Sequence, residues 1–242
     1  MDSLTGLTRA GDSDPPKYDK RDLTYANSFE NGFQAFFIKA VEWLTGKISL
    51  VRMVREFERR GGAQGLEFWG AALDVMGIEI TTPAEQFDNI PKQGPVVVIA
   101  NHPHGLVDGM VMAELIARVR PDFQILTREV LTGLDEAASS YLIPVPFPYD
   151  KDVQKKSVEM RAKAMDKLKA GGLICIFPSG VVATSETAFG PVVEAEWNVF
   201  TAQLIRRSGA TVVPIHFRGR NSRTYHIANR ISATFRQAML LH

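Results

Sequence analysis

The chain has 242 residues, of which 45% are hydrophobic and 23% are charged, and its formal net charge is +1. This composition is typical of a globular protein large enough for a full hydrophobic core, and we expect one domain preceded by helices. The single cysteine, Cys175, excludes a disulfide framework within the chain and favours a reducing compartment. The sequence has no run of about 18 apolar residues, which argues against a membrane-spanning helix, and its first residues lack a secretory-signal pattern.

The N-terminal part of the chain predicts a loose tail followed by amphipathic helices. Residues 1–28 are rich in Asp, Ser, Gly, Pro and Lys and have few apolar residues, as disordered tails do. Apolar residues recur at helical spacing over residues 31–59, and a second helix is expected over residues 64–76. The first of these helices either packs its apolar face on the core or lies in the plane of a membrane surface. We treat residues 29–77 as an N-terminal helical region.

A short strand leads from these helices to a run of apolar residues that ends in polar side chains. Residues 78–82 alternate in hydrophobicity, which predicts a strand. Residues 95–100 form an apolar, β-branched run, as expected of a buried central strand. The residues that follow are Asn-His-Pro-His-Gly-Leu-Val-Asp-Gly, which place His102 and His104 directly after the strand.

Asp108 completes this motif in the first turn of a helix predicted over residues 106–119. Its carboxylate can turn back toward the end of the strand, where it can pair with an imidazole, fix the tautomer of the ring and stabilise the imidazolium. The carboxyl ends of strands in open α/β sheets are where functional sites lie. The motif therefore predicts a general base, with either His102 or His104 as the partner of Asp108.

Further along the chain, strands and helices alternate, and a second strand ends in a polar turn. Strands are expected over residues 123–127 and 173–177, with a helix over residues 153–170 between them. The second strand is followed by a sharp turn made of Pro178, Ser179 and Gly180. Because this placement repeats that of the histidine motif, we expect both turns on one edge of the sheet, where main-chain N–H groups can hold an anion.

The C-terminal part is strongly basic. A helix is predicted over residues 197–208, a strand over 211–217 and a last amphipathic helix over 232–241. No Asp or Glu follows Glu196, whereas seven arginines do, and this asymmetry favours an anionic partner. Lysine clusters with interleaved aromatic residues, typical of nucleic-acid binding, are absent, so we expect a lipid surface and no nucleic acid.

Several of these motifs, in this order, resemble those of the PlsC-like glycerolipid acyltransferases, the lysophospholipid acyltransferase superfamily, and most of all its hemolysin-like, ornithine-lipid-type branch. Residues 101–109 resemble the first motif, residues 177–180 the third and the Val-Pro-Ile strand at 213–215 the fourth. The resemblance covers about residues 75–240. The sequence departs from the pattern in two places. His102 and Asp108 are separated by five residues instead of the usual four. In the third motif, Ser179 stands where the family has a glutamate, and the arginine that comes after this glutamate in the family is missing.

This resemblance implies an α/β fold with a mixed central sheet flanked by helices, over residues 78–242. It implies transfer of an acyl group from acyl-CoA or acyl carrier protein to the hydroxyl of a lyso-lipid, with a 1-acylglycerol-3-phosphate-like or lyso-ornithine-lipid-like acceptor and no metal or resident cofactor. His102 is then the general base and Asp108 its partner. The expected location is peripheral, on the cytoplasmic side of the inner membrane.

The resemblance also implies a set of substrate-binding residues. Arg128 corresponds to the second motif region, although an ion pair with Glu129 would explain it equally well. Arg218 and Arg220 carry guanidinium groups suited to phosphate oxygens and can supply what the third motif lacks. The complete expected set is His104, Gly105, Arg128, Pro178, Ser179, Gly180, Arg218 and Arg220.

Two other functions fit parts of the sequence. A metal-dependent hydrolase could use His102, His104 and a nearby aspartate, but it would need further ligands downstream. No aspartate follows Asp166, and the later histidines are His216, His226 and His242. A non-catalytic lipid-binding protein could instead use the N-terminal amphipathic helix and the arginine-rich C-terminal part.

Overall fold

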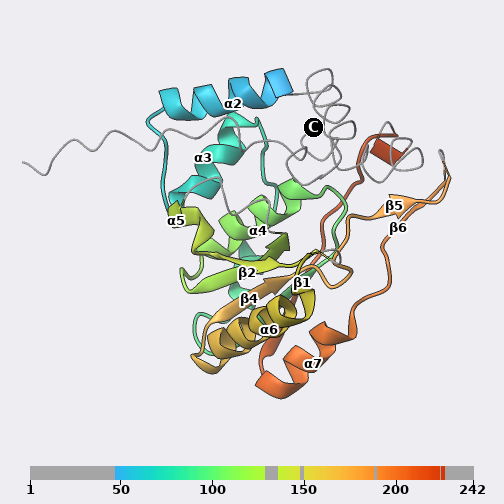
Figure 1. The fold of residues 1–242 in the computed structure, drawn as a ribbon. Coiled ribbons are helices and arrows are strands. Elements are labelled where there is room, and N and C mark those ends of the chain that lie inside the picture. Colours follow the sequence, from blue (N-terminus) through green and yellow to red (C-terminus); the bar gives the residue numbers. More distant parts are fainter. Residues whose placement is uncertain (1–46, 129–135, 148–149, 188–189, 224, 227–242) are drawn as a thin grey trace, which may run out of the picture.

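A computed structural model describes residues 47–128, 136–147, 150–187, 190–223 and 225–226 (Figure 1). Its centre is a five-stranded sheet with the order β3-β2-β4-β1-β7, in which every pairing is parallel. The strands of this sheet are β1 Val96–Ala100, β2 Phe123–Arg128, β3 Leu142–Val145, β4 Leu173–Ile176 and β7 Thr211–Ile215. A separate antiparallel ribbon consists of β5 Thr184–Ser185 and β6 Val192–Val193.

Helices cover both faces of the sheet, as parallel sheets require. The described helices are α2 Lys47–Arg59, α3 Glu67–Val75, α4 Leu106–Ala117, α5 Glu136–Ser139, α6 Val153–Lys169 and α7 Val199–Ser208, with a 3-10 helix η2 at Ala84–Asn89. In Figure 1, α2, α3 and α4 lie on one side of the sheet, and α6 and α7 lie on the other. The predicted α/β fold with flanking helices is therefore confirmed.

The β-branched run of β1 occupies the interior of the sheet because strands pair with it on both sides. Val96 lies beside Leu173 of β4 and Thr211 of β7, and the registers continue along the strand. Successive side chains of a strand point to opposite faces. Val96 and Val98 accordingly join one core cluster with α3 and α4, whereas Val97 joins a second cluster with α6 and α7.

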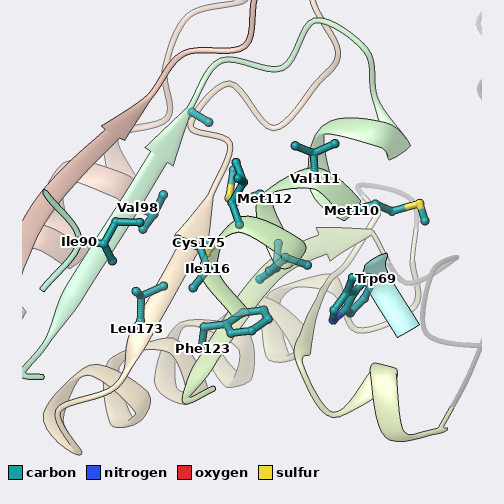
Figure 2. Packing of buried hydrophobic residues seen from close by; sticks show 14 of the residues in the cluster. Trp69, Ile90, Val98, Met110, Val111, Met112, Ile116, Phe123, Leu173 and Cys175 are labelled. Carbon is teal, nitrogen blue, oxygen red and sulfur yellow. The ribbon is translucent and has the colours of Figure 1, made fainter. Parts of the chain in front are cut away.

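The larger core cluster fixes the position of α4, the helix that carries the predicted site. Figure 2 shows Met112 and Ile116 of α4 packed over Val98, Leu173 and Cys175 of the sheet. Cys175 is fully buried, and burial raises the pKa of its thiol, so it is a core residue as the sequence indicated. A fully buried aliphatic side chain, such as that of Ile116 or Leu173, contributes roughly 1.5–3 kcal/mol to folding. The start of α4 is thereby held firmly against the end of β1.

Two expectations require correction. Residues 78–82 form no strand: Ile78 and Ile80 are half-buried against the larger core cluster, but none of the described strands pairs with their main chain. The alternation in this segment shows which side chains face the core, and it does not show that the main chain is hydrogen-bonded to another strand. The central sheet, expected to be mixed, is parallel throughout the described strands, and antiparallel pairing is confined to the β5–β6 ribbon.

The predicted tail over residues 1–28, the first part of the helix over 31–59 and the helix over 232–241 lie outside the described residues. Among the described helices, none has the length and apolar character needed to cross a membrane.

Candidate active site

The site begins with a tight turn between β1 and α4. Gly105, the residue before the helix, has a φ of +80°, a conformation that glycine adopts without the steric cost that a Cβ would bring. This turn aims two main-chain N–H groups at the Asp108 carboxylate. The N–H groups of His104 and Gly105 donate to Asp108 Oδ2 at 2.8 and 3.0 Å. Asp108 is 1% exposed, and its charge lies in the first turn of α4, where the helix dipole favours an anion.

His102 completes the pair that the sequence predicted. Its Nδ1 lies 3.0 Å from Asp108 Oδ2, and its side chain is 17% exposed. Because that oxygen already accepts from two main-chain N–H groups, it acts as an acceptor toward the ring, and Nδ1 carries the hydrogen. Nε2 is then the nitrogen with the free lone pair, as a general base requires. Nothing among the described residues hydrogen-bonds to Nε2.

A neighbouring aromatic ring and a main-chain contact hold the His102 ring in place. Phe177, which follows β4, stacks on it with ring centroids 4.0 Å apart and an angle of 24° between the planes. The His102 carbonyl accepts from the Ala183 N–H at 2.8 Å, which ties the histidine turn to the loop after β4. Sequence reasoning assigned no role to Phe177. The sequence did predict that the strand ending at Phe177 would finish at the same edge of the sheet as β1. This position was the feature that could have identified Phe177 as a neighbour of His102.

Asn101 joins the ends of β1 and β7. Its side-chain Nδ2–H donates to the Phe217 carbonyl at 2.8 Å, and its Oδ1 accepts from the Phe217 N–H at 2.7 Å. The amide thus replaces a pair of ladder hydrogen bonds just beyond the last paired residues, Ala100 and Ile215. This contact is the second feature that sequence reasoning missed, although Asn101 lies inside the motif.

His104 is directed away from the carboxylate. Its ring Nε2 lies 3.0 Å from the Arg218 carbonyl oxygen, which can only accept, so Nε2 carries a hydrogen. Its main-chain N–H, and not its ring, binds Asp108. Of the two histidines that the sequence left open as partners of Asp108, the geometry favours His102.

The turn after β4 lies beside the histidine turn, as expected of adjacent parallel strands. Pro178 is buried, Ser179 is half-buried, and Gly180 has a φ of +65°. The Ser179 hydroxyl donates to the Val181 carbonyl at 3.0 Å. The Gly180 N–H donates to the Phe177 carbonyl at 2.9 Å and is therefore occupied within the turn. Because Pro178 has no N–H and that of Gly180 is already bonded, the predicted anion site at this turn is reduced to the main-chain N–H of Ser179.

The predicted arginines lie at the same edge of the sheet. Arg218 and Arg220 follow β7 and are exposed, and neither has an ion-pair partner within the described part of the chain. Arg128 is the last residue of β2, opposite Val145 of β3. Its side chain lies outside what the structure describes, so its predicted role stays a prediction.

The two imidazoles of the predicted metal site have different partners, Asp108 for His102 and the Arg218 carbonyl for His104. Across the described ranges, no three side chains of His, Cys, Asp or Glu lie close enough together to hold a metal ion.

Comparison with known proteins shows which family the chain belongs to. The chain is 29% identical over 172 residues to a lyso-glycine lipid O-acyltransferase of Bacteroides thetaiotaomicron, which covers 68% of this chain and 55% of the relative. It is 26% identical over 166 residues to a lyso-glycine lipid O-acyltransferase of Phocaeicola vulgatus, covering 68% of this chain and 53% of the relative. The chain thus spans about half the length of these relatives. The model of the Acyltransferase family matches residues 84–218, more than half of the sequence, and the chain belongs to that family.

Proposed function

We propose that this protein transfers a fatty acyl group from a thioester donor, acyl-CoA or acyl carrier protein, to the hydroxyl of a lyso-lipid. The observation that carries the proposal is the hydrogen bond between His102 Nδ1 and Asp108 Oδ2 at the carboxyl end of the central strand. It gives the ring the tautomer in which Nε2 can accept a proton. Membership of the Acyltransferase family supports the same chemistry.

The chemical step then proceeds as follows. His102 Nε2 takes the proton of the acceptor hydroxyl while the hydroxyl oxygen attacks the thioester carbonyl carbon. The tetrahedral intermediate collapses, the carbon–sulfur bond breaks, and the imidazolium returns the proton to the leaving thiolate. The products are an oxygen ester and a free thiol. Because the thioester brings its own leaving group, this step requires no resident cofactor.

Each neighbour of the base has a distinct part in this step. Asp108 stabilises the imidazolium that forms on proton uptake, and the Phe177 stack keeps the ring plane aligned. The N–H of Ser179, on the adjacent turn, is the candidate donor to the oxyanion. General-base catalysis of this kind contributes about a hundred- to ten-thousand-fold to the rate.

The acceptor that we would test first is a lyso-glycine lipid, because both relatives are named for it. Lysophosphatidic acid and a lyso-ornithine lipid are the next candidates. A radiolabelled acyl donor offered with each acceptor, and the products separated by lipid chromatography, identifies the substrate. Acyl-CoA and acyl carrier protein are compared as donors in the same assay.

The test of the mechanism is the His102→Ala variant. We expect its acyl transfer to fall by about a hundred- to ten-thousand-fold, with an unchanged circular dichroism spectrum. The matched control is His216→Ala, which removes an exposed histidine one residue after β7 and should leave transfer unchanged. Full activity in His102→Ala would refute the base assignment. Stoichiometric zinc bound by His102 and His104 in the purified protein would favour the metal-dependent hydrolase.

The proposal also places the protein peripherally on the cytoplasmic face of a membrane. In α2, Phe57 is buried against Phe68 with ring centroids 5.4 Å apart, so the last turns of the helix dock on the core. Arg52 and Arg55 of the same helix are exposed and can approach anionic head groups. Flotation with vesicles that contain anionic lipid, compared with phosphatidylcholine vesicles, tests the location. Equal binding to both would contradict an electrostatic contribution.

A further inference from the structure

The segment after β7, residues 217–220, which we call the arginine loop, is tied to the histidine motif at two points. The first is the pair of hydrogen bonds between the Asn101 amide and the main chain of Phe217. The second is the hydrogen bond that His104 Nε2 donates to the Arg218 carbonyl at 3.0 Å. These contacts join parts of the chain that are more than a hundred residues apart in sequence, so they fix the loop relative to the site.

Gly219 provides a second, independent sign that the ring of His104 positions this loop. Its φ is +104°, a conformation that L side chains rarely adopt. A Cβ at this position would lie 3.0 Å from His104 Cε1 and 3.1 Å from His104 Nε2. The ring therefore packs directly on the Cα of the glycine, and a larger residue would push the loop away from it.

The loop carries two positive charges next to the histidine motif. Arg218 and Arg220 are exposed, and no carboxylate pairs with either of them in the described part of the chain. A guanidinium group offers a planar fork that binds two oxygens of a carboxylate or phosphate at once. Such binding depends on where the main chain holds the arginine.

We propose that His104 is a positioning residue which, together with Gly219, holds the arginine loop so that Arg218 and Arg220 bind an anionic group of a substrate. The inference rests on the proposed acyl transfer and deepens it. The anionic group is a carboxylate or phosphate, supplied by the acceptor head group or by the acyl donor. We do not assign His104 as a second base, because the Asp108 carboxylate pairs with the ring of His102 and binds His104 only through its main-chain N–H.

The central experiment compares His104→Leu with His104→Gln in steady-state kinetics. Leucine removes the hydrogen bond to the Arg218 carbonyl, whereas the glutamine amide can replace the Nε2–H donor. We expect His104→Leu to raise KM by about fivefold or more, since a hydrogen bond of this kind contributes about 1 kcal/mol. The value of kcat should stay within about twofold of wild type, and His104→Gln should return KM toward wild type. A fall in kcat with unchanged KM, or an equal effect of both variants, would overturn the proposal.

Two arms of the experiment identify the source of the anion. KM is measured separately for acyl-CoA and for the lyso-lipid acceptor, and acyl-pantetheine serves as a donor without the nucleotide phosphates. If the donor supplies the anion, the KM for acyl-CoA rises in His104→Leu and the KM for acyl-pantetheine does not. If the acceptor supplies it, the acceptor KM rises with either donor. An unchanged KM in every arm would overturn the proposal.

Substitutions of two glycines distinguish the effect of the contact with His104 from the effect of backbone strain. Gly219→Ala adds a methyl group against the His104 ring, whereas Gly61→Ala adds one at a similar φ of +99° with no atom within 4 Å. We expect Gly219→Ala to raise KM as His104→Leu does and Gly61→Ala to leave it unchanged. An unchanged KM in Gly219→Ala would contradict the proposed contact.

Hydrogen–deuterium exchange tests the positioning without any turnover. Main-chain amides of residues 217–221 should exchange faster in His104→Leu than in wild type, while amides of β1 exchange at the same rate. If the wild type transfers no acyl group, the proposed function fails, but this exchange result still decides whether His104 holds the loop. Unchanged exchange in the loop would overturn the positioning role.

Discussion

At the amino ends of the strands, Arg120 is 3% exposed and every N–H of its guanidinium donates a hydrogen bond. The acceptors are both carboxylate oxygens of Asp122 and the main-chain carbonyls of Pro91, Gly94 and Gly171. These residues precede β1, β2 and β4, so one buried side chain fastens three strands. No N–H group of this guanidinium is left without an acceptor.

At the carboxyl ends of the same strands, polar groups are held in place but not saturated. Asp108 Oδ2 accepts three hydrogen bonds, whereas its buried Oδ1 has no partner among the described groups. Arg218 and Arg220 are exposed without a described carboxylate partner. Buried polar groups are normally satisfied, and exceptions tend to mark functional sites. The contrast teaches that the buried guanidinium at one end of the sheet is fully bonded within the protein, whereas the other end, where we propose the chemistry, keeps polar groups available to a ligand.

The variant Asp108→Asn should produce the largest effect and separate the two ends most clearly. The amide oxygen can still accept from the N–H groups of His104 and Gly105, but it no longer carries the charge that, in the proposed mechanism, stabilises the His102 imidazolium. We expect acyl transfer to fall by about a hundredfold or more, with the melting temperature nearly unchanged. The control is Asp74→Asn, an exposed aspartate on α3. Transfer within about threefold of wild type would show that the charge of Asp108 is not needed.

The variant Arg120→Met should have the opposite effects: a large loss of stability and no change in acyl transfer. It leaves three main-chain carbonyls without their donor, and we expect the free energy of unfolding to fall by about 3 kcal/mol. The kcat and KM of the folded fraction should be unchanged. Arg118→Met is the matched control, because Arg118, just after α4, is 49% exposed and its ion-pair partner among the described residues is Glu114 of that helix. A loss below about 1 kcal/mol in urea denaturation, or an altered KM, would break the comparison.

Much of this arrangement could be predicted from the sequence because hydrophobic patterns report burial. The β-branched run at residues 95–100 and the apolar run at 173–177 became adjacent central strands, so the turns that follow them share an edge. The alternation at residues 78–82 was misleading for the same reason. Ile78 and Ile80 do face the core, but a pattern of burial carries no information about a hydrogen-bonded neighbour.

The contacts that complete the site could not be predicted, because they depend on residues distant in sequence. The spacing of His104 and Asp108 allowed the ring to face the carboxylate. In the structure, the loop after β7 provides the Arg218 carbonyl, and the ring binds there instead. The stack of Phe177 on His102 likewise follows from the pairing of β1 with β4 and not from any local pattern.

The variant Asn101→Ala tests whether the carboxyl end also contributes to stability. It removes both hydrogen bonds to Phe217, and we expect a loss of about 1–2 kcal/mol in the free energy of unfolding. Asn101→Asp should be at least as destabilising, because a second carboxylate oxygen would face the Phe217 carbonyl. Asn89→Ala, at an exposed position of η2, is the control. If the alanine variant is as stable as the control, the amide does not fasten β1 to β7.

The smallest expected effect is the contribution of Asp122, at the amino end of the sheet, to the pH dependence of the unfolding free energy. Hydrogen bonds from Arg120 hold the pKa of the Asp122 carboxyl below its ordinary value. A lowered pKa in the folded state means that this contribution to stability is full above the unfolded pKa, near 4, and is lost as the pH falls through the folded pKa. We therefore expect wild type to exceed Asp122→Asn in unfolding free energy at pH 7, by less than about 1 kcal/mol because the carboxylate is 46% exposed.

That difference should shrink as the pH falls below about 4 and close below the folded pKa, where Asp122 is neutral in both the folded and the unfolded protein. Urea denaturation of both proteins across this range measures it, with Asp88→Asn, an exposed aspartate in η2, as the control for a general charge effect. In an Arg120→Met background, Asp122→Asn should change the pH dependence much less, because the guanidinium that contributes most to lowering the pKa is gone. A gap that persists there undiminished would mean that Asp122 acts through some other group, and the amino end would then not be held by Arg120 alone.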